Sequence, residues 1–266
     1  MKLKIRLCYK VVLITLLFIS GLIIVAIIFP ALDVLCTPSY AKHQRDALKM
    51  AWLKWFGVIV GLRVSKEGEA LNRPCLLVSN HISWLDIIVL GRFTPAHFVA
   101  KSDILAWPVV GYLAKQGGTI FVRRGDKQQA KATAEQMVWQ LKQNSTVIAF
   151  PEGTTTKGDG VLPFHAFLFQ SALLTKANIQ PVALEYMGVA KGHAPFIGED
   201  TFVPHLIKIL SLDKIEVRVA FLAEINTAGK NRHFVSNEAR AMILDSVTGE
   251  KDKNQATAIP KLKRQL

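Results

Sequence analysis

An uncharged apolar stretch near the start of the chain limits what this sequence can fold into. Residues 11–29 read VVLITLLFISGLIIVAIIF, and Pro30 follows them. As an α-helix this stretch would be roughly 28 Å long, close to the hydrocarbon thickness of a bilayer. The residues before it include four basic and no acidic side chains: Lys2, Lys4, Arg6 and Lys10. The pattern predicts a membrane anchor.

A cleaved targeting segment is the alternative interpretation. A secretory signal peptide has the same basic start, but its apolar core is usually about 7–15 residues long and a small-residue cleavage site follows. No A-x-A site follows here, and the sequence DVLC at 33–36 is a poor lipoprotein site because Leu35 is not small. We therefore expect the anchor to be retained.

A second apolar patch, MAWLKWFGVIVGL at residues 50–62, is too short to span a bilayer comfortably. It contains Trp52, Lys54 and Trp55, and such side chains favour the interface between headgroups and acyl chains. A buried helix of the globular part is the alternative. We expect this patch to form a hairpin with residues 11–29 that enters one leaflet, so that both ends stay on one side of the membrane.

Composition limits the classes of binding partner but does not identify one. The 266 residues carry a formal net charge of +13, half of them are hydrophobic, and the mean hydropathy is +0.27. A basic surface suits nucleic acid, anionic lipid or an acidic carrier protein. The three cysteines show neither a disulfide framework nor zinc-site spacing, which is typical of a reducing compartment.

Short apolar runs alternate with helical patterns from residue 73 onward. We expect strands at 75–79, 96–100, 119–122, 145–150, 179–186 and 214–222, the last half exposed because its residues alternate. Helices are expected at 85–90, 107–116, 126–142, 164–176 and 236–248, the last capped by Ser236 and stopped by Gly249. This order predicts an α/β domain with a mixed, mainly parallel sheet flanked by helices. It would cover 65–249, between membrane-anchoring helices at 1–64 and a basic tail at 250–266.

Polar residues follow four of these strands, where ligands bind in open α/β sheets. They are His81, Lys101, the pair Arg123 and Arg124, and Glu152. Together they predict one site. Its lysine and arginines favour an anionic group, because a guanidinium binds phosphate or carboxylate through two hydrogen bonds.

His81 and Asp86 lie five positions apart in the apolar segment SNHISWLDI. They could be a core histidine and the carboxylate that satisfies it, or a general base and the acid that orients its ring. No GxSxG elbow and no cysteine beside the histidine offers a nucleophile. A base without a nucleophile favours direct attack by a substrate hydroxyl.

Two motifs carry a resemblance to a known family. NHISWLD at 80–86 resembles the NHxxxxD motif of the glycerolipid acyltransferases, the family of the 1-acyl-sn-glycerol-3-phosphate acyltransferases, and FPEGT at 150–154 resembles its second signature. GGTIFVRR at 117–124 is similar to its arginine-bearing segment, and the resemblance covers roughly residues 73–186.

The resemblance implies a role for each matching residue. His81 would be the base and Asp86 its orienting acid. The acyl-acceptor site would contain Lys101, Arg123, Arg124, Glu152, Gly153 and Thr154. The reaction would move a fatty acyl group from acyl-CoA or acyl carrier protein to a lysolipid hydroxyl. The oxyanion donors are expected among backbone N–H groups of the motif loops. No metal, cofactor or nucleic acid is expected, and the enzyme would sit in the cytoplasmic membrane facing the cytosol.

Departures from the family pattern leave the acceptor headgroup open. Thr155 stands where many members have an arginine, and Arg123 stands where an aspartate is common. Lysophosphatidic acid is the first choice, with Arg123 supplying a replacement charge. Lyso-ornithine lipid is the alternative, because the acyltransferases of that lipid resemble this chain in SWLDI and in the threonines after FPEG. A lipid-binding protein without turnover and a hydrolase are the remaining hypotheses.

Overall fold

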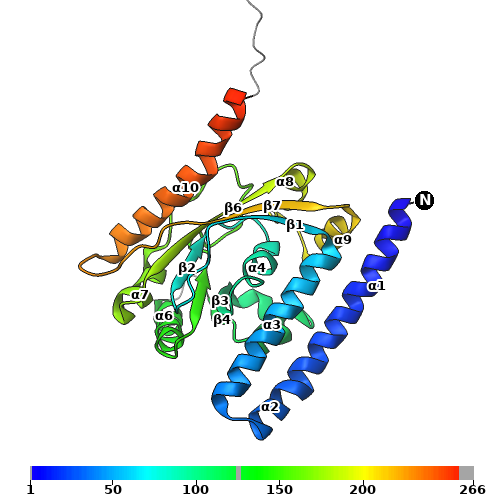
Figure 1. The fold of residues 1–266 in the computed structure, drawn as a ribbon, viewed down its shortest axis with the longest axis horizontal. Helices are drawn as coiled ribbons and strands as arrows, with labels where there is room; N and C mark the ends of the chain where they lie inside the picture. The colour runs from blue at the N-terminus through cyan, green and yellow to red at the C-terminus, as the bar shows by residue number, and fades with distance from the viewer. Residues whose placement is uncertain (1, 124–126, 258–266) are drawn as a thin grey trace, which may run out of the picture.

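A computed structural model describes residues 2–123 and 127–257. Figure 1 shows a central sheet covered on both faces by helices, with a pair of long N-terminal helices along one side. Arg124 lies outside the described residues, and so does the tail beyond residue 257. The expected α/β architecture is confirmed.

One seven-stranded sheet has the order β1-β7-β6-β2-β5-β3-β4. All neighbouring strands are parallel except β6 and β7, which pair antiparallel. The strands are β1 (Leu62–Glu67), β2 (Leu76–Ser79), β3 (Ala96–Lys101), β4 (Ile120–Val122), β5 (Thr146–Ala149), β6 (Ile179–Met187) and β7 (Ile215–Phe221). The central strands β2 and β5 are buried along their whole length, which explains their uninterrupted apolar sequences.

Helices pack on both faces of the sheet. One face is covered by α3 (Pro38–Val60), α4 (Leu85–Leu90) and α9 (Phe202–Ser211), and the other by α6 (Lys127–Lys142), α7 (Gln170–Thr175) and α10 (Arg232–Thr257). Shorter helical elements between the strands are α5 (Val110–Gln116), α8 (Val189–His193) and the 3-10 helices Ser102–Ala106 and Ala166–Phe169. The helix expected at 126–142 is present as α6, and its residues Met137 and Leu141 are buried.

Three local predictions were wrong. Strand β7 is almost wholly buried instead of half exposed, because β1 pairs with it on one side and β6 on the other. The final helix begins at Arg232, where the Asn231 side chain accepts hydrogen bonds from two first-turn N–H groups, and Ser236 is buried inside it. Gly249 does not end this helix, which continues to Thr257.

The N-terminal segment folds back on itself. Helix α1 (Lys2–Ile23) continues through the π-helical turn Ile24–Ile28 into α2 (Phe29–Leu35), and α3 returns beside it in the opposite direction (Figure 1). The Trp52 indole donates to the Leu17 carbonyl at 2.9 Å, and Phe18 packs edge-on against Trp52. The expected helical hairpin is therefore present.

Basic residues of α1 fix its first turns to the globular part of the chain. Lys10 is buried and its Nζ donates to the carbonyls of Val60 and Leu212, at 3.0 and 2.8 Å. Arg6 pairs with Asp213 at 2.8 Å. The start of α1 and the end of α3 therefore both lie against the globular part, and the hairpin turn lies at the far end.

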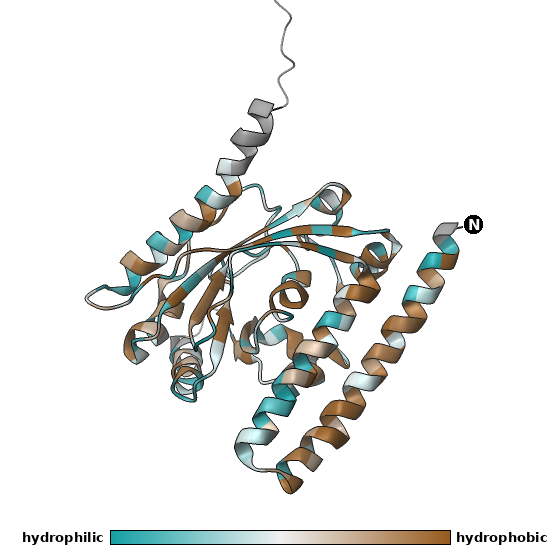
Figure 2. Cartoon of the chain, viewed as in Figure 1, coloured by the Kyte–Doolittle hydropathy of each residue, from teal (hydrophilic) through white to brown (hydrophobic). Residues whose placement is uncertain are grey.

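The hairpin exposes apolar side chains on its outer side. Figure 2 shows α1 as hydrophobic along most of its length, and residues 4–35 form the one helix in the described chain that is long and apolar enough to cross a membrane. Exposed residues of α1 and the turn that follows it include Val12, Leu16, Ile19, Ile23 and Ile27. On α3, Trp55 is exposed whereas Phe56 is buried. The second apolar patch therefore has some side chains in the core and others on the surface.

Candidate active site

The His81–Asp86 pair lies at the carboxyl end of β2. His81 follows the strand by two positions, and Asp86 lies in the first turn of α4. His81 Nδ1 is 2.8 Å from Asp86 Oδ2. Since an ionised carboxylate only accepts hydrogen bonds, the histidine carries its proton on Nδ1 and keeps Nε2 free to act as a base. The spacing in the sequence thus does bring the two side chains together.

Asp86 is completely buried and accepts four hydrogen bonds. Besides His81, the backbone N–H groups of Ile82 and Ser83 donate to Oδ2 at 2.7 and 3.0 Å, and the Tyr186 hydroxyl donates to Oδ1 at 2.8 Å. Burial raises the pKa of Tyr186 well above its ordinary value of 10, and the charge of Asp86 raises it further. Tyr186 therefore stays neutral and keeps donating, which stabilises a buried charge that would otherwise be costly.

The segment after β5 holds the other side of the histidine. The Phe150 ring stacks on the imidazole with a centroid distance of 4.0 Å. Glu152 Oε1 accepts from the His81 N–H at 2.7 Å, and its Oε2 accepts from the Leu162 N–H at 2.8 Å. Burial raises the pKa of this carboxyl above its ordinary 4.5, while the two backbone hydrogen bonds oppose the rise. Thr156 N–H donates to the His81 carbonyl at 2.9 Å, which completes the support.

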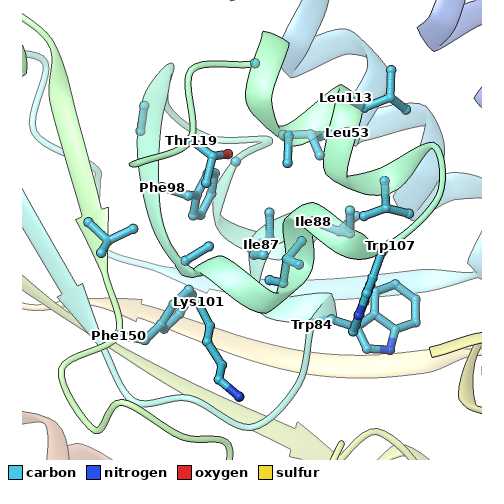
Figure 3. Close-up of a pocket in the computed structure, with 18 of the residues that line it drawn as sticks. Leu53, Trp84, Ile87, Ile88, Phe98, Lys101, Trp107, Leu113, Thr119 and Phe150 are labelled. Carbon is cyan, nitrogen blue, oxygen red and sulfur yellow. The ribbon is translucent and has the colours of Figure 1, made fainter. Parts of the chain in front are cut away.

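A mostly apolar cavity of about 840 Å³ opens beside His81. From His81 it extends between α4, β3 and α5 to the N-terminal hairpin, where Phe18, Gly21 and Trp52 line it. In Figure 3, Ile87, Ile88 and Phe98 line its apolar part, while Lys101 extends away from them. A mostly apolar cavity of this size beside a histidine is suited to a fatty acyl chain whose reactive end lies at His81.

Charged residues gather on the exposed part of this cavity. We call Lys101, Asp103, Arg123 and Asp200 the polar rim, because all four line the cavity and are exposed. Lys101 forms an ion pair with Asp103. Arg123 directly follows β4, as expected.

The predicted site residues divide into two groups. His81, Lys101, Arg123, Gly153 and Thr154 line the cavity. Asp86 and Glu152 are buried and do not line the cavity, and Glu152 is bonded to the backbone of His81 and Leu162.

Five backbone N–H groups near His81 are already bonded within the protein, which narrows the expected choice of oxyanion donors. They belong to His81, Ile82, Ser83, Gly153 and Thr156.

Sequence reasoning missed Tyr186, Phe150 and Asp200. Tyr186 ends the predicted strand 179–186, and only the pairing of β6 with β2 shows that its hydroxyl reaches Asp86. Asp200 lies in a segment of no regular pattern. Within the described residues, no group of three or more His, Cys, Asp or Glu side chains is placed to hold a metal ion.

Comparison with known proteins decides the family. A family model described as Acyltransferase matches residues 61–185. The lyso-ornithine lipid O-acyltransferase of Pseudomonas aeruginosa is 36% identical over 207 residues, which are 77% of this chain and 80% of that protein. The chain belongs to the acyltransferase family.

Two further relatives differ in the acceptor that their names give. The lyso-ornithine lipid O-acyltransferase of Rhizobium meliloti is 33% identical, with 86% of this chain and 85% of that protein covered. The 1-acyl-sn-glycerol-3-phosphate acyltransferase of Neisseria meningitidis is 31% identical, with 70% and 76% covered. The crystal structure of the acyltransferase PlsC from Thermotoga maritima shares the fold of this acyltransferase, with a TM-score of 0.64 and 18% identity. The match covers 92% of this chain and 98% of that chain.

Proposed function

We propose that this acyltransferase moves a fatty acyl group from a thioester, on CoA or acyl carrier protein, to the hydroxyl of a lysolipid. The observation that carries the proposal is the His81–Asp86 pair, whose histidine lines a mostly apolar cavity that reaches the N-terminal hairpin. A binding protein would have no need of a buried carboxylate that orients a histidine.

His81 Nε2 removes the proton of the acceptor hydroxyl as its oxygen attacks the thioester carbonyl carbon. The resulting tetrahedral oxyanion collapses, the carbon–sulfur bond breaks, and the leaving thiolate takes the proton from the imidazolium. The products are an ester and a free thiol. Asp86 holds the ring by Nδ1 and stabilises its protonated form, and general-base catalysis of this kind contributes about 10²–10⁴-fold.

Lyso-ornithine lipid is the acceptor that we favour, which reverses the order reached from the sequence. Two of the more similar relatives carry that activity in their names and match more of the chain than the Neisseria protein does. In addition, Thr155 replaces a cation of the family pattern, and its hydroxyl donates to the Phe196 carbonyl. Lysophosphatidic acid is the second candidate, supported by the relative of that name and by Arg123 on the rim.

The proposed location is the cytosolic face of the cytoplasmic membrane. The thioester donors are cytosolic, and the exposed apolar side of α1 would enter one leaflet. Lys10 and Arg6 hold the start of α1 against the globular part, so the N-terminus would lie on the same side as the active site. Cysteine-accessibility labelling at residues 2 and 160 would overturn the hairpin arrangement if the two positions were on opposite sides.

An acceptor panel tests the reaction. Purified protein is incubated with labelled acyl-CoA or acyl carrier protein and with lyso-ornithine lipid, lysophosphatidic acid or no acceptor, and the lipids are analysed by mass spectrometry. We expect labelled ornithine lipid and a much slower release of free fatty acid. Free fatty acid in every arm would indicate a hydrolase, and no turnover with retained lipid binding would indicate a binding protein.

A further inference from the structure

We propose that Asp200 binds the ammonium group of a zwitterionic acceptor headgroup and that Arg123, on the same cavity, binds its carboxylate. The inference rests on the proposed function, because a headgroup built on ornithine carries one ammonium and one carboxylate. It assigns acceptor selectivity to a residue outside both sequence motifs.

Asp200 belongs to the segment 194–201 that connects α8 to α9. Phe196, Ile197, Gly198 and Asp200 line the same cavity as His81. Asp200 Oδ2 accepts from the Ile197 N–H at 3.1 Å. Within the part of the chain that the structure describes, Asp200 forms no ion pair, whereas Asp103 is paired with Lys101. Asp200 is therefore the rim carboxylate available to a cation from the substrate.

The two catalytic motifs hold this segment in place. The Phe196 N–H donates to the Ile82 carbonyl at 3.0 Å, and the Thr155 hydroxyl donates to the Phe196 carbonyl. The N–H group and the carbonyl group of Phe196 are thus bonded to the segments that carry His81 and the FPEGT motif. The residue that replaces the family arginine is the same one that positions the segment with Asp200.

The charge of the rim suits a zwitterion better than a phosphomonoester. The described rim has two cations, Lys101 and Arg123, and two carboxylates, Asp103 and Asp200. Lys49 also lines the cavity, but it is paired with Asp46 on α3. A phosphomonoester carries nearly two negative charges, and Asp200 would repel them. A headgroup with one charge of each sign finds a partner for both.

The test compares Asp200→Asn with wild type on two acceptors: lyso-ornithine lipid, and the same lipid with its side-chain ammonium acetylated. Asparagine keeps an oxygen for the Ile197 N–H, so the segment should retain its shape. Glu199→Gln is the matched control, because Glu199 is exposed, adjacent in the chain and absent from the residues that line the cavity.

We expect Asp200→Asn to raise the KM for lyso-ornithine lipid about fivefold, the effect of one partly screened ion pair. In Asp200→Asn, the KM for the acetylated acceptor and the KM for the acyl donor should equal the wild-type values within the error of the assay. Glu199→Gln should leave all three KM values unchanged. An equal rise for both acceptors, no rise for either, or the same rise in Glu199→Gln would overturn the inference. If wild type transfers no acyl group to lyso-ornithine lipid, the proposed acceptor itself is wrong, and this outcome is seen before any variant is measured.

Discussion

The His81–Asp86 pair and the polar rim lie along one cavity but differ in how firmly the protein holds them. Asp86 is fully buried and bonded to four donors, and His81 is held at its ring, its N–H and its carbonyl. The rim residues are exposed, and the described hydrogen bonds of Asp200 are two, both with the backbone of Ile197 in its own segment.

In the function that we propose, this difference separates two tasks of one enzyme. A base has to be held within a fraction of an ångström for proton transfer, and dense burial provides that precision. Headgroup selection needs only charges of the right sign, and exposed side chains can change without disturbing the fold. We therefore expect substitutions in the pair to abolish transfer and substitutions on the rim to redirect it.

Replacing His81 with alanine should produce the largest loss. We expect transfer to fall by at least about 10³-fold, because the general base is removed. The melting temperature should change little, since Asp86 keeps three of its four donors and the side chain of His81 is partly exposed at the cavity. Turnover near the wild-type rate in a folded variant would contradict the assigned role.

Asp86→Asn should lower activity by about a hundredfold or more and should also destabilise the fold. The asparagine amide has only one oxygen, and its NH₂ group faces groups that donated hydrogen bonds to the carboxylate. At least one buried donor therefore loses its acceptor, at a cost of about 1–3 kcal/mol. Thermal unfolding beside a kinetic assay measures both effects. An unchanged melting temperature together with full activity would show that the carboxylate charge is dispensable.

Tyr186→Phe should have a smaller effect. The variant removes one hydrogen bond to a charged group, worth about 2 kcal/mol of stability. Asp86 keeps its bond to the His81 ring and its two backbone donors, so we expect kcat to fall no more than about tenfold. Thermal unfolding beside a kinetic assay measures both effects. A loss of kcat as large as that of Asp86→Asn, in a folded variant, would contradict this ranking.

Thr155→Arg should have the smallest effect on rate and should act on selectivity. The arginine adds a cation next to the rim and removes the hydrogen bond to Phe196. We expect the ratio of kcat/KM for lysophosphatidic acid to that for lyso-ornithine lipid to rise about fivefold. Thr155→Val removes the same hydrogen bond without adding charge. If the valine variant shifts the ratio as far as the arginine variant does, charge is not the cause.

The sequence predicted the fold well where apolar periodicity decides it. Residues 85–90 form the helix expected there, and the predicted strands occur within one or two residues of their expected ends. Strand β1 was missed because it follows the apolar hairpin without a break and four of its six residues are polar. Helix α9 was also missed. The burial of β7 depends on a partner that lies more than 140 residues away in the chain.

The site was predictable where a motif supplied the residues. His81 and Asp86 were found because one short segment holds both. Tyr186 and Asp200 come from other parts of the chain and reach the site only through the pairing of β6 with β2 and the anchoring of Phe196. A sequence also cannot show that both carboxylate oxygens of Glu152 are bonded to backbone N–H groups and that this side chain is absent from the cavity lining.

The separation of chemistry from acceptor choice is tested most directly by the double variant Thr155→Arg/Asp200→Asn. Steady-state kinetics with saturating acyl donor would give kcat and KM for lyso-ornithine lipid and for lysophosphatidic acid, beside the values of the wild type. The account predicts that the preference for lyso-ornithine lipid is lost or reversed through the two KM values, while kcat on either acceptor stays within about threefold. A collapse of kcat on both acceptors, with their ratio of kcat/KM unchanged, would contradict it.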